Sequence, residues 1–369
     1  MERAYHRLIS GESVGGLPAV GRGSLLAASL LYRSIVGVRN FAYDHGLKPV
    51  ERLGVPVISV GNMTTGGTGK TPTVIMIARQ LCALGARPAV LTRGYGARSG
   101  MESDEVLVIR RQCPDVPVVV DADRVRGGNR AMTEFGADLL LLDDGFQHRR
   151  LAREINLVLV DATRPMGIPG VLPRGTWREP PACLSRATHV MLTRCEQISQ
   201  ELADVAAELL SQWVGSRNIL QQRTRVTGVM DGEGKRWDLY DKKTLAFAGI
   251  GNPESFMHTL EAAGCRPLIG CWFGDHHHYH PEVDFKAMEE LTRRRGIDVW
   301  VTTLKDFVKL GGYTPPVPLV YVGIESYVAG SQLDVWRDML RGVITGAGKR
   351  SPGHGPPNAE TGRPGISIT

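Results

Sequence analysis

The sequence predicts an α/β protein with a parallel-sheet domain and a second, smaller α/β domain. Its 369 residues exceed the usual length of one domain. From Val55 onward, short β-branched runs end in Gly or Asp and lead into helix-like stretches, which is typical of parallel strands joined by crossover helices. Five such runs come first, at residues 57–60, 89–92, 139–142, 155–160 and 190–193. A second set follows residue 224, at 245–248, 299–302 and 319–322, with a helix near 281–295.

The composition is that of a folded, soluble protein. Hydrophobic residues make up 42% and charged residues 22%, which excludes a disordered chain and a membrane bundle. The six cysteines are widely spaced with no CxxC pair, which argues against a disulfide scaffold or a zinc ribbon and favours a reducing compartment. The net charge of +6 and the pI near 9.0 favour an anionic partner without choosing among nucleotide, phosphorylated substrate, nucleic acid and acidic lipid.

Residues 1–54 are predicted to form an amphipathic, membrane-associating segment. Ser24 is a candidate cap for a helix with many apolar residues, and the uncharged run between Arg22 and Arg33 is too short to span a bilayer, which needs roughly 20 apolar residues. Seven basic and four acidic residues give this segment a charge of +3, which suits an anionic membrane surface. A helix packed on the protein's own core explains the pattern equally well.

The rest of the chain divides into three predicted parts. Residues 55–223 form the parallel-sheet domain, residues 224–344 form the smaller α/β domain, and residues 345–369 form a disordered tail rich in Gly and Pro. Within the smaller domain, the stretch from Gly249 to Asn252 is interpreted as a turn, with Asn252 capping a helix that begins at Pro253.

A glycine-rich turn lies between the first strand and a helix at 74–84. It departs from GxxxxGK[ST] only at its first position and comprises Thr64, Thr65, Gly66, Gly67, Thr68, Gly69, Lys70 and Thr71. Backbone amides of such a turn bind phosphate oxygens, so these residues are predicted to contact a nucleotide, with Lys70 at the β and γ phosphates and Thr71 on Mg²⁺. The sequence therefore predicts that the parallel-sheet domain is a P-loop NTPase domain.

An apolar strand at residues 139–142 runs directly into Asp143 and Asp144. P-loop enzymes place the acid that holds Mg²⁺, directly or through water, at such a strand end, so Asp143 or Asp144 is a predicted metal ligand. No [NT]KxD motif for guanine follows a later strand, because the stretch from Thr303 to Asp306 has the wrong spacing. ATP and Mg²⁺ are therefore the predicted cofactors.

Two further stretches concentrate polar chemistry. The run from His276 to His280 is compatible with a metal site, a solvated loop or a catalytic histidine. Adjacent histidines in an extended chain point to alternating sides, which argues against the metal site. Arg93 and the acids Asp104 and Glu105 follow the second strand, at the carboxyl edge where ligands of open α/β sheets bind.

The chain resembles the tetraacyldisaccharide 4'-kinase family, which phosphorylates lipid A precursors. The resemblance spans about residues 20–340 and is carried, in this order, by SVGNMTTGGTGKTP, LTRGYG, LLDDGFQHRRLAR, LPRGTWREP, FAGIGNPESF and FGDHHHY. It implies ATP-dependent phosphorylation of the 4'-hydroxyl of a tetraacylated disaccharide 1-phosphate at the cytoplasmic face of the inner membrane. It also implies a P-loop domain, a smaller α/β domain that closes on it, and an N-terminal helix that meets lipid.

The resemblance also assigns roles to residues that match the family's motifs. It implies that Asp104 is the general base and His276 its partner, while Lys70 binds the phosphates. Arg178 and Glu179 would touch nucleotide or substrate, and Arg124 would meet a substrate phosphate. Ser103 and Leu304 depart from the family, which usually has Gly and Glu at those positions.

A P-loop switch protein or metallochaperone that uses the His276–His280 run as its metal site is the alternative from another class. Nucleic-acid binding is not expected, because the basic surplus lacks interleaved aromatic residues and a recognisable module. The expected state is a peripheral membrane enzyme and a monomer.

Overall fold

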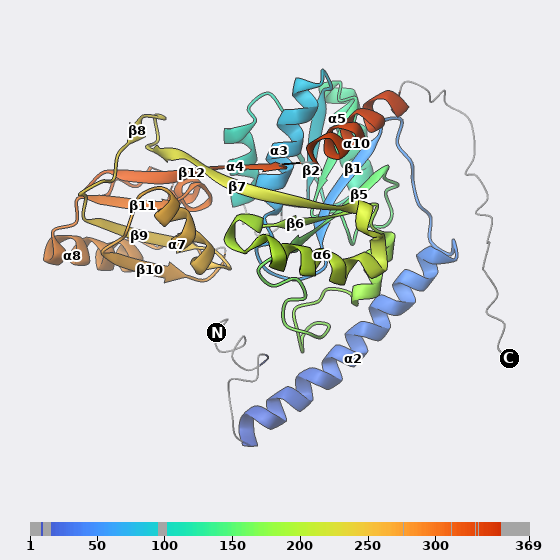
Figure 1. The fold of residues 1–369 in the computed structure, drawn as a ribbon, viewed down its shortest axis with the longest axis horizontal. Coiled ribbons are helices and arrows are strands. Elements are labelled where there is room, and N and C mark those ends of the chain that lie inside the picture. The colour runs from blue at the N-terminus through green and yellow to red at the C-terminus, as the bar shows by residue number, and fades with distance from the viewer. Residues whose placement is uncertain are drawn as a thin grey trace.

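The computed structural model describes residue 9 and residues 16–94, 102–275, 277–310, 312–328, 330 and 332–347. The strands of these residues form one continuous sheet that runs through a larger and a smaller lobe (Figure 1). Its order is β10-β9-β11-β12-β7-β6-β5-β1-β4-β2-β3, with β8 paired to β7. All neighbours except β7 with β12 and β7 with β8 are parallel, so the predicted α/β class is confirmed.

The larger lobe holds the predicted parallel sheet. Its strands are β1 (Val57–Asn62), β2 (Pro88–Thr92), β3 (Val118–Val120), β4 (Leu139–Asp143), β5 (Ile155–Asp161) and β6 (His189–Thr193). Every residue of β1, β2 and β4 is buried, because helices cover both faces of the sheet. Burial on both faces explains why the leucines of β4 are consecutive rather than alternating with polar residues.

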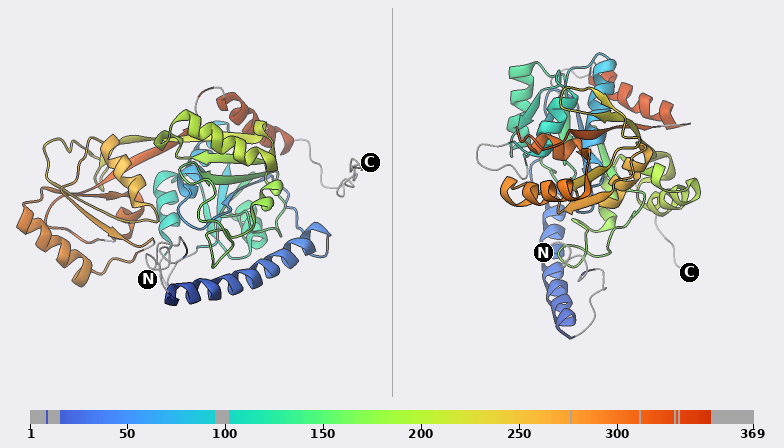
Figure 2. Two further views of the ribbon diagram at one scale, coloured as in Figure 1. Left: turned by 60° about the horizontal axis from the view of Figure 1, so that its bottom comes forward. Right: turned by 90° about the vertical axis from the view of Figure 1, so that its left-hand side faces the viewer.

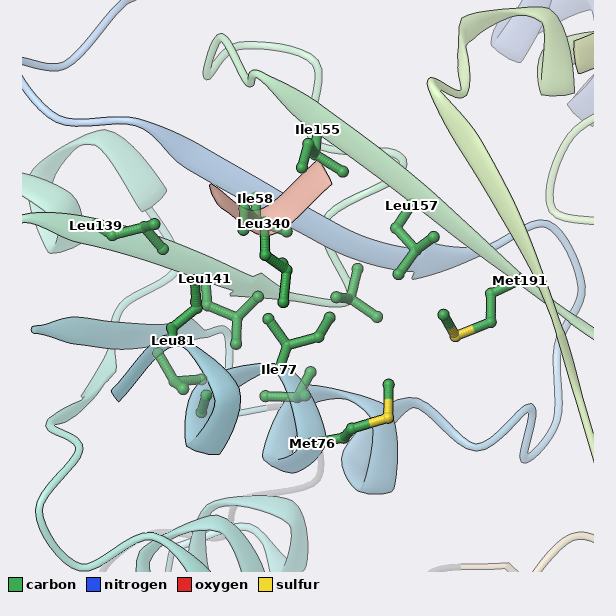
Figure 3. Packing of buried hydrophobic residues seen from close by; sticks show 14 of the residues in the cluster. Ile58, Met76, Ile77, Leu81, Leu139, Leu141, Ile155, Leu157, Met191 and Leu340 are labelled. Atoms are coloured by element: carbon green, nitrogen blue, oxygen red, sulfur yellow. The ribbon is translucent and has the colours of Figure 1, made fainter. Parts of the chain in front are cut away.

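Five helices cover the two faces of this sheet. One face packs against α3 (Lys70–Ala83), α4 (Asp104–Gln112) and α10 (Gln332–Ala347), the other against α5 (Arg124–Phe135) and α6 (Gln200–Val214). Figure 3 shows the first of these cores, where Ile77 and Leu81 of α3 and Leu340 of α10 meet strand residues such as Leu141. The last helix of the described chain thus completes the core of the larger lobe, which the sequence did not reveal.

The smaller lobe repeats the parallel arrangement. Its elements are β9 (Thr244–Gly249), α7 (Pro253–Ala262), β10 (Ile269–Phe273), a π-helical turn (Pro281–Phe285), α8 (Lys286–Arg295), β11 (Val299–Thr303), α9 (Leu304–Phe307) and β12 (Leu319–Val328). Pro253 is the first residue of α7, and the Asn252 side chain accepts a hydrogen bond of 3.1 Å from Ser255 N, as predicted for a cap. Short 3₁₀ segments lie at Pro181–Arg186, Cys195–Gln197, Ser216–Asn218 and Val308–Leu310.

A two-stranded ribbon joins the lobes. The long strand β7 (Ile219–Met230) pairs in parallel with β6 through its first three residues and then runs antiparallel to β12. Its far end pairs with the short β8 (Arg236–Trp237). The predicted boundary between residues 223 and 224 therefore falls inside a strand. The domain limits stay a prediction. Helix α10 continues to Ala347, which is three residues into the predicted tail. The rest of that tail, residues 348–369, lies outside the described part of the chain.

The N-terminal helix α2 (Gly16–Asp44) runs beside the larger lobe and projects from it (Figures 1 and 2). It begins before Ser24, whose Oγ donates to Val20 O at 3.2 Å, so the prediction that Ser24 caps the helix is wrong. A narrow stripe faces the body: Ser29 is buried and donates to Val171 O at 2.6 Å, and Val36 is also buried. The opposite side exposes Leu26, Leu30, Leu31, Ile35, Val38 and Phe41.

Candidate active site

A cavity of about 1340 Å³ lies where the two lobes and α2 meet. The larger lobe lines it with the glycine-rich loop and with residues that follow β2, β4 and β6, which are the carboxyl ends of parallel strands. Tyr32 and Arg39 of α2 line it as well. The smaller lobe contributes the turn after β9 and the start of α9, and the ribbon of β7 and β12 completes the lining.

The glycine-rich loop is held in place by neighbouring strands. Thr193 Oγ1, at the end of β6, donates to Thr68 O at 3.0 Å, and Asn62 Nδ2 donates to Thr68 Oγ1 at 2.9 Å. The Arg194 guanidinium bridges Gly67 O and Asp161. Gly69 has a φ of 81° immediately before α3, a conformation that a side chain would strain. Residues 65–71 line the cavity, whereas Thr64 forms a β-bridge with Trp177 outside its lining.

The two carboxylates after β4 have different surroundings. Asp144 receives hydrogen bonds of 2.9 Å at both oxygens from Arg178 Nη1, and Lys70 Nζ lies 3.7 Å from its Oδ1. Burial raises the pKa of Asp144, but Lys70 and Arg178 outweigh it and hold the pKa below its ordinary value. Burial raises the pKa of Asp143 to about 6, against the attraction of Lys70. Asp143 Oδ1 is buried and accepts no hydrogen bond within the described chain.

Two further cavity residues are buried beside these acids. Arg124 is 4% exposed, and burial lowers its pKa even though Asp143 and Asp144 pull it upward. Burial, reinforced by the charges of Arg124 and Arg153, lowers the pKa of His148 to about 4. His148 is therefore a neutral group at pH 7, beside cations and carboxylates. The predicted residues Lys70, Thr71, Arg124, Asp143, Asp144 and Arg178 are thus brought together on one cavity wall.

Asp104 lies at the first turn of α4, where the smaller lobe reaches it with two lysines. Lys305 Nζ and Lys309 Nζ each lie 3.5 Å from Asp104 Oδ2. Lys309 is itself held 2.8 Å from Asp306 Oδ1, and Lys305 lies 3.0 Å from Asp275. Although burial alone would lower the pKa of Lys305, the carboxylates of Asp275, Asp104 and Glu105 raise it. Asp104 is 7% exposed and lies just behind Glu105, which lines the cavity.

Glu179 lies away from the cavity lining. It is fully buried, and its carboxylate joins Arg39 at 3.2 Å, Asn40 at 2.6 Å and Arg186 at 2.9 Å. Two of these partners come from α2, so the carboxylate ties this helix to the larger lobe. The expectation that Glu179 touches a ligand receives no support from its position, because all of its surface is enclosed by its own chain.

The histidine run is only partly described, since His276 lies outside the described residues. His277 Nε2 lies 2.9 Å from Asp284 Oδ2, and its ring stacks on Phe273 with centroids 4.5 Å apart. No group of three or more His, Cys, Asp or Glu side chains in the described part of the chain is arranged to hold a metal ion. The described histidines therefore give the metallochaperone alternative no support.

The turn after β9 touches the glycine-rich loop. A Cβ on Gly251 would lie 3.5 Å from Gly67 N, so the smaller lobe lies directly against the loop. Gln197 Nε2 donates to Ser255 Oγ at 2.8 Å beside this contact. Sequence reasoning missed Lys309, Thr193 and Arg194. The last two carry the same signal as Asp143, polar residues directly after a buried strand, whereas Lys309 offers no local signal.

Residues 22–341 match the tetraacyldisaccharide-1-P 4'-kinase family, LpxK. The chain belongs to this family. It is 40% identical to a tetraacyldisaccharide 4'-kinase of Syntrophus aciditrophicus (strain SB) over 331 residues, which covers 81% of this chain and 87% of that protein. It is 34% identical to the enzyme of the same name from Geobacter sulfurreducens, covering 87% of this chain and 93% of that protein.

A solved structure of an LpxK family member agrees with the fold. The crystal structure of LpxK from Aquifex aeolicus in complex with ATP superposes with a TM-score of 0.68 at 26% identity, covering 87% of this chain and 99% of that one. The family predicted from the sequence motifs is therefore confirmed, and this LpxK family member is a kinase.

Proposed function

We propose that this LpxK family member transfers the γ-phosphoryl group of ATP to the 4'-hydroxyl of a tetraacyldisaccharide 1-phosphate, giving the 4'-phosphorylated lipid A precursor. Membership of the family supports the reaction. The observation that carries it is the convergence of the glycine-rich loop, Lys70 and two carboxylates on one wall of a cavity that α2 also lines. A cavity of this size holds a nucleotide and a sugar headgroup together.

The glycine-rich loop is the proposed site for the triphosphate. Its amides and the start of α3 would bind phosphate oxygens, and Lys70 would offset the negative charge that spreads over the transferred group. Arg178 and Arg124 line the same wall and are proposed to contact phosphate groups of the nucleotide or the lipid. Lys70 Nζ lies 3.7 Å from Asp144 Oδ1, which is too long for a hydrogen bond, so the ammonium group is available to bind a phosphate.

Magnesium is proposed to lie between Thr71, Asp143 and Asp144. Asp143 Oδ1 fits this role because it is a buried oxygen with no hydrogen-bond donor in the described chain, whereas Arg178 occupies Asp144. Oxygen donors of this kind suit Mg²⁺, so Asp143 is the better direct ligand. When bound, the ion would offset the negative charge of the phosphate groups.

Asp104 is proposed as the base that takes the proton of the sugar hydroxyl, with His276 as its partner. Its place at the edge of the cavity, one residue from Glu105, supports the role. A carboxylate can accept the hydroxyl proton, and the lysines 3.5 Å away hold this one in place.

We further propose that the enzyme is a peripheral monomer at the cytoplasmic face of the inner membrane and that α2 contacts the lipid. The exposed apolar side of α2 supports this interpretation over a helix buried on the body. No described helix is long and apolar enough to cross a membrane. Arg39 and Tyr32 bring the same helix to the cavity, so an acylated substrate can reach the site from the surface.

The test is transfer of labelled phosphate from γ-labelled ATP to a tetraacyl disaccharide 1-phosphate in detergent micelles. Wild type should phosphorylate the lipid, and Asp104→Ala and His276→Ala should lose most of that activity. Folded, ATP-binding wild type that transfers no phosphate would refute the function. Full activity of Asp104→Ala would leave the proposed kinase function standing and would refute the role of Asp104 as the base.

The membrane contact has a separate test. The double variant Leu31→Glu, Ile35→Glu should sediment less with vesicles that contain anionic phospholipid. Thr133→Glu, which changes an exposed residue of α5, should sediment like wild type. Unchanged vesicle binding of the α2 variant would refute the contact.

A further inference from the structure

Gln222 lies where β7 passes from one lobe to the other. The three residues before it pair with β6, and from Gln222 onward β7 pairs with β12, where Gln222 is opposite Val328. Its side chain is only 2% exposed. Burying a primary amide costs free energy unless both of its polar atoms have hydrogen-bond partners. The partners of the Gln222 side chain therefore indicate its structural role.

Gln222 connects the ribbon to the glycine-rich loop. Its Nε2 donates to Ser326 Oγ on β12 at 3.0 Å, and its Oε1 lies 2.7 Å from Thr73 Oγ1 on α3. The Thr73 hydroxyl also lies 2.9 Å from Gly69 O, so it shares its single proton between the ribbon and the last glycine of the loop. Ser326, Gln222 and Thr73 are buried and Gly69 is half-buried, so most of this chain of contacts is shielded from water, which strengthens its hydrogen bonds.

A second polar contact fixes α3 further along its length. Trp336 Nε1, on α10, donates to Gln80 Oε1 at 2.5 Å, about two turns after Thr73. Trp336 is fully buried. Gln222 of β7 is itself bonded to Ser326 of β12, and α10 follows β12 in the chain. The helix α3 is therefore attached at two points, to the ribbon at Thr73 and to α10 at Gln80, and two points fix the direction of a helix better than one.

We propose that Gln222 is a positioning residue for phosphoryl transfer, which sets the orientation of α3 and its phosphate loop against the ribbon that carries the smaller lobe. The inference rests on the proposed kinase function. The smaller lobe lies against the loop at Gly251 and Gly67, so a tilt between α3 and the ribbon changes how the two lobes enclose a triphosphate. Misplacement of reacting groups by about 1 Å is enough to slow a transfer that depends on alignment.

The test compares Gln222→Leu, Thr73→Val and the double variant with wild type. Leucine keeps the approximate size of the side chain, and valine keeps the shape of threonine. Gln221→Leu is the matched control, because Gln221 is the neighbouring residue of β7 and its side chain bonds to Gln200 and Asp204 instead. The readouts are kcat and KM for ATP and lipid, the ATP dissociation constant by calorimetry, and the melting temperature.

Gln222→Leu should lower kcat/KM for ATP about tenfold and leave the lipid KM within about twofold of wild type. The double variant should lose no more than the worse single variant, because both remove one connection. Gln221→Leu should match wild type. A merely structural role would lower the melting temperature without this selective loss on the ATP side.

Wild-type ATP parameters in folded Gln222→Leu would overturn the proposal, and so would losses that multiply in the double variant. If Gln222→Leu does not fold, Thr73→Val and Ser326→Ala make the same comparison. If wild type binds ATP without phosphorylating lipid, the proposed function fails. Weaker ATP binding in Gln222→Leu and Thr73→Val would still show that the link between the ribbon and α3 positions the loop.

Discussion

The two sides of the cavity are assembled in different ways. The side proposed to bind phosphate is made by residues 65–71 and by Asp143 and Asp144, all within the larger lobe and all at the ends of two adjacent strands. The side that holds Asp104 is assembled across the lobes, since Lys305 and Lys309 come from beyond β11. The first side follows from local sequence, whereas the second depends on how two distant segments meet. Relative motion of the lobes therefore affects the second side more.

The largest expected effect lies on the phosphate side. Lys70→Ala should reduce kcat by about 10²–10³, because it removes a cation positioned for the charge of the transferred group. The melting temperature should change little, because the ion pair with Asp144 is long, at 3.7 Å, and Asp144 keeps Arg178 as its partner. Turnover and thermal unfolding are measured together, with exposed Lys242→Ala as the control. Intact turnover of Lys70→Ala would remove this residue from the mechanism.

The cross-lobe side gives a second, smaller effect. Lys309→Met should lower kcat about tenfold, less than the loss of about 10²–10⁴ typical when a general base is removed, because it displaces Asp104 without removing it. The matched control is Lys286→Met, a lysine of the same lobe whose partner Glu282 is exposed. Full activity of Lys309→Met would show that the larger lobe positions Asp104 alone, and the comparison of the two sides would fail.

The same distinction explains what the sequence could predict. Eight of the strands, the glycine-rich turn and the cap at Asn252 were predictable because each depends on neighbours within a few residues, whereas β3, β8 and β10 were not predicted. The continuation of β7 into both lobes was not, since strand pairing is set by partners a hundred residues away. Glu179 lies outside the cavity lining. Its motif identifies a neighbour of Arg178 but does not say which side of the backbone faces the cavity.

A substitution of Glu179 should change the stability of the protein rather than its turnover. Glu179→Ala should lower the free energy of unfolding by about 2–3 kcal/mol, because the guanidiniums of Arg39 and Arg186 lose a buried partner. The cost is below the roughly 3–5 kcal/mol of a fully buried pair because both arginines are partly exposed. Urea unfolding measures the loss. Glu134→Ala, which breaks the exposed pair with Arg130, should cost less than about 1 kcal/mol. Equal losses in the two variants would contradict the anchoring role of Glu179.

The last effect is a pH dependence that belongs to the phosphate side and is small near neutral pH. Burial lowers the folded-state pKa of His148 to about 4, whereas an exposed histidine in the unfolded chain titrates near 6.5. Between these values the unfolded state binds more protons than the folded state, so stability is complete above about pH 6.5 and falls as the pH drops toward 4. The melting temperature of wild type should decline over this interval more steeply than that of His148→Gln, which cannot titrate. Parallel declines would show that His148 does not stay neutral in the fold. A steeper wild-type decline would instead identify the interior beside Arg124 as a place where added positive charge destabilises the wall on which the triphosphate is proposed to bind.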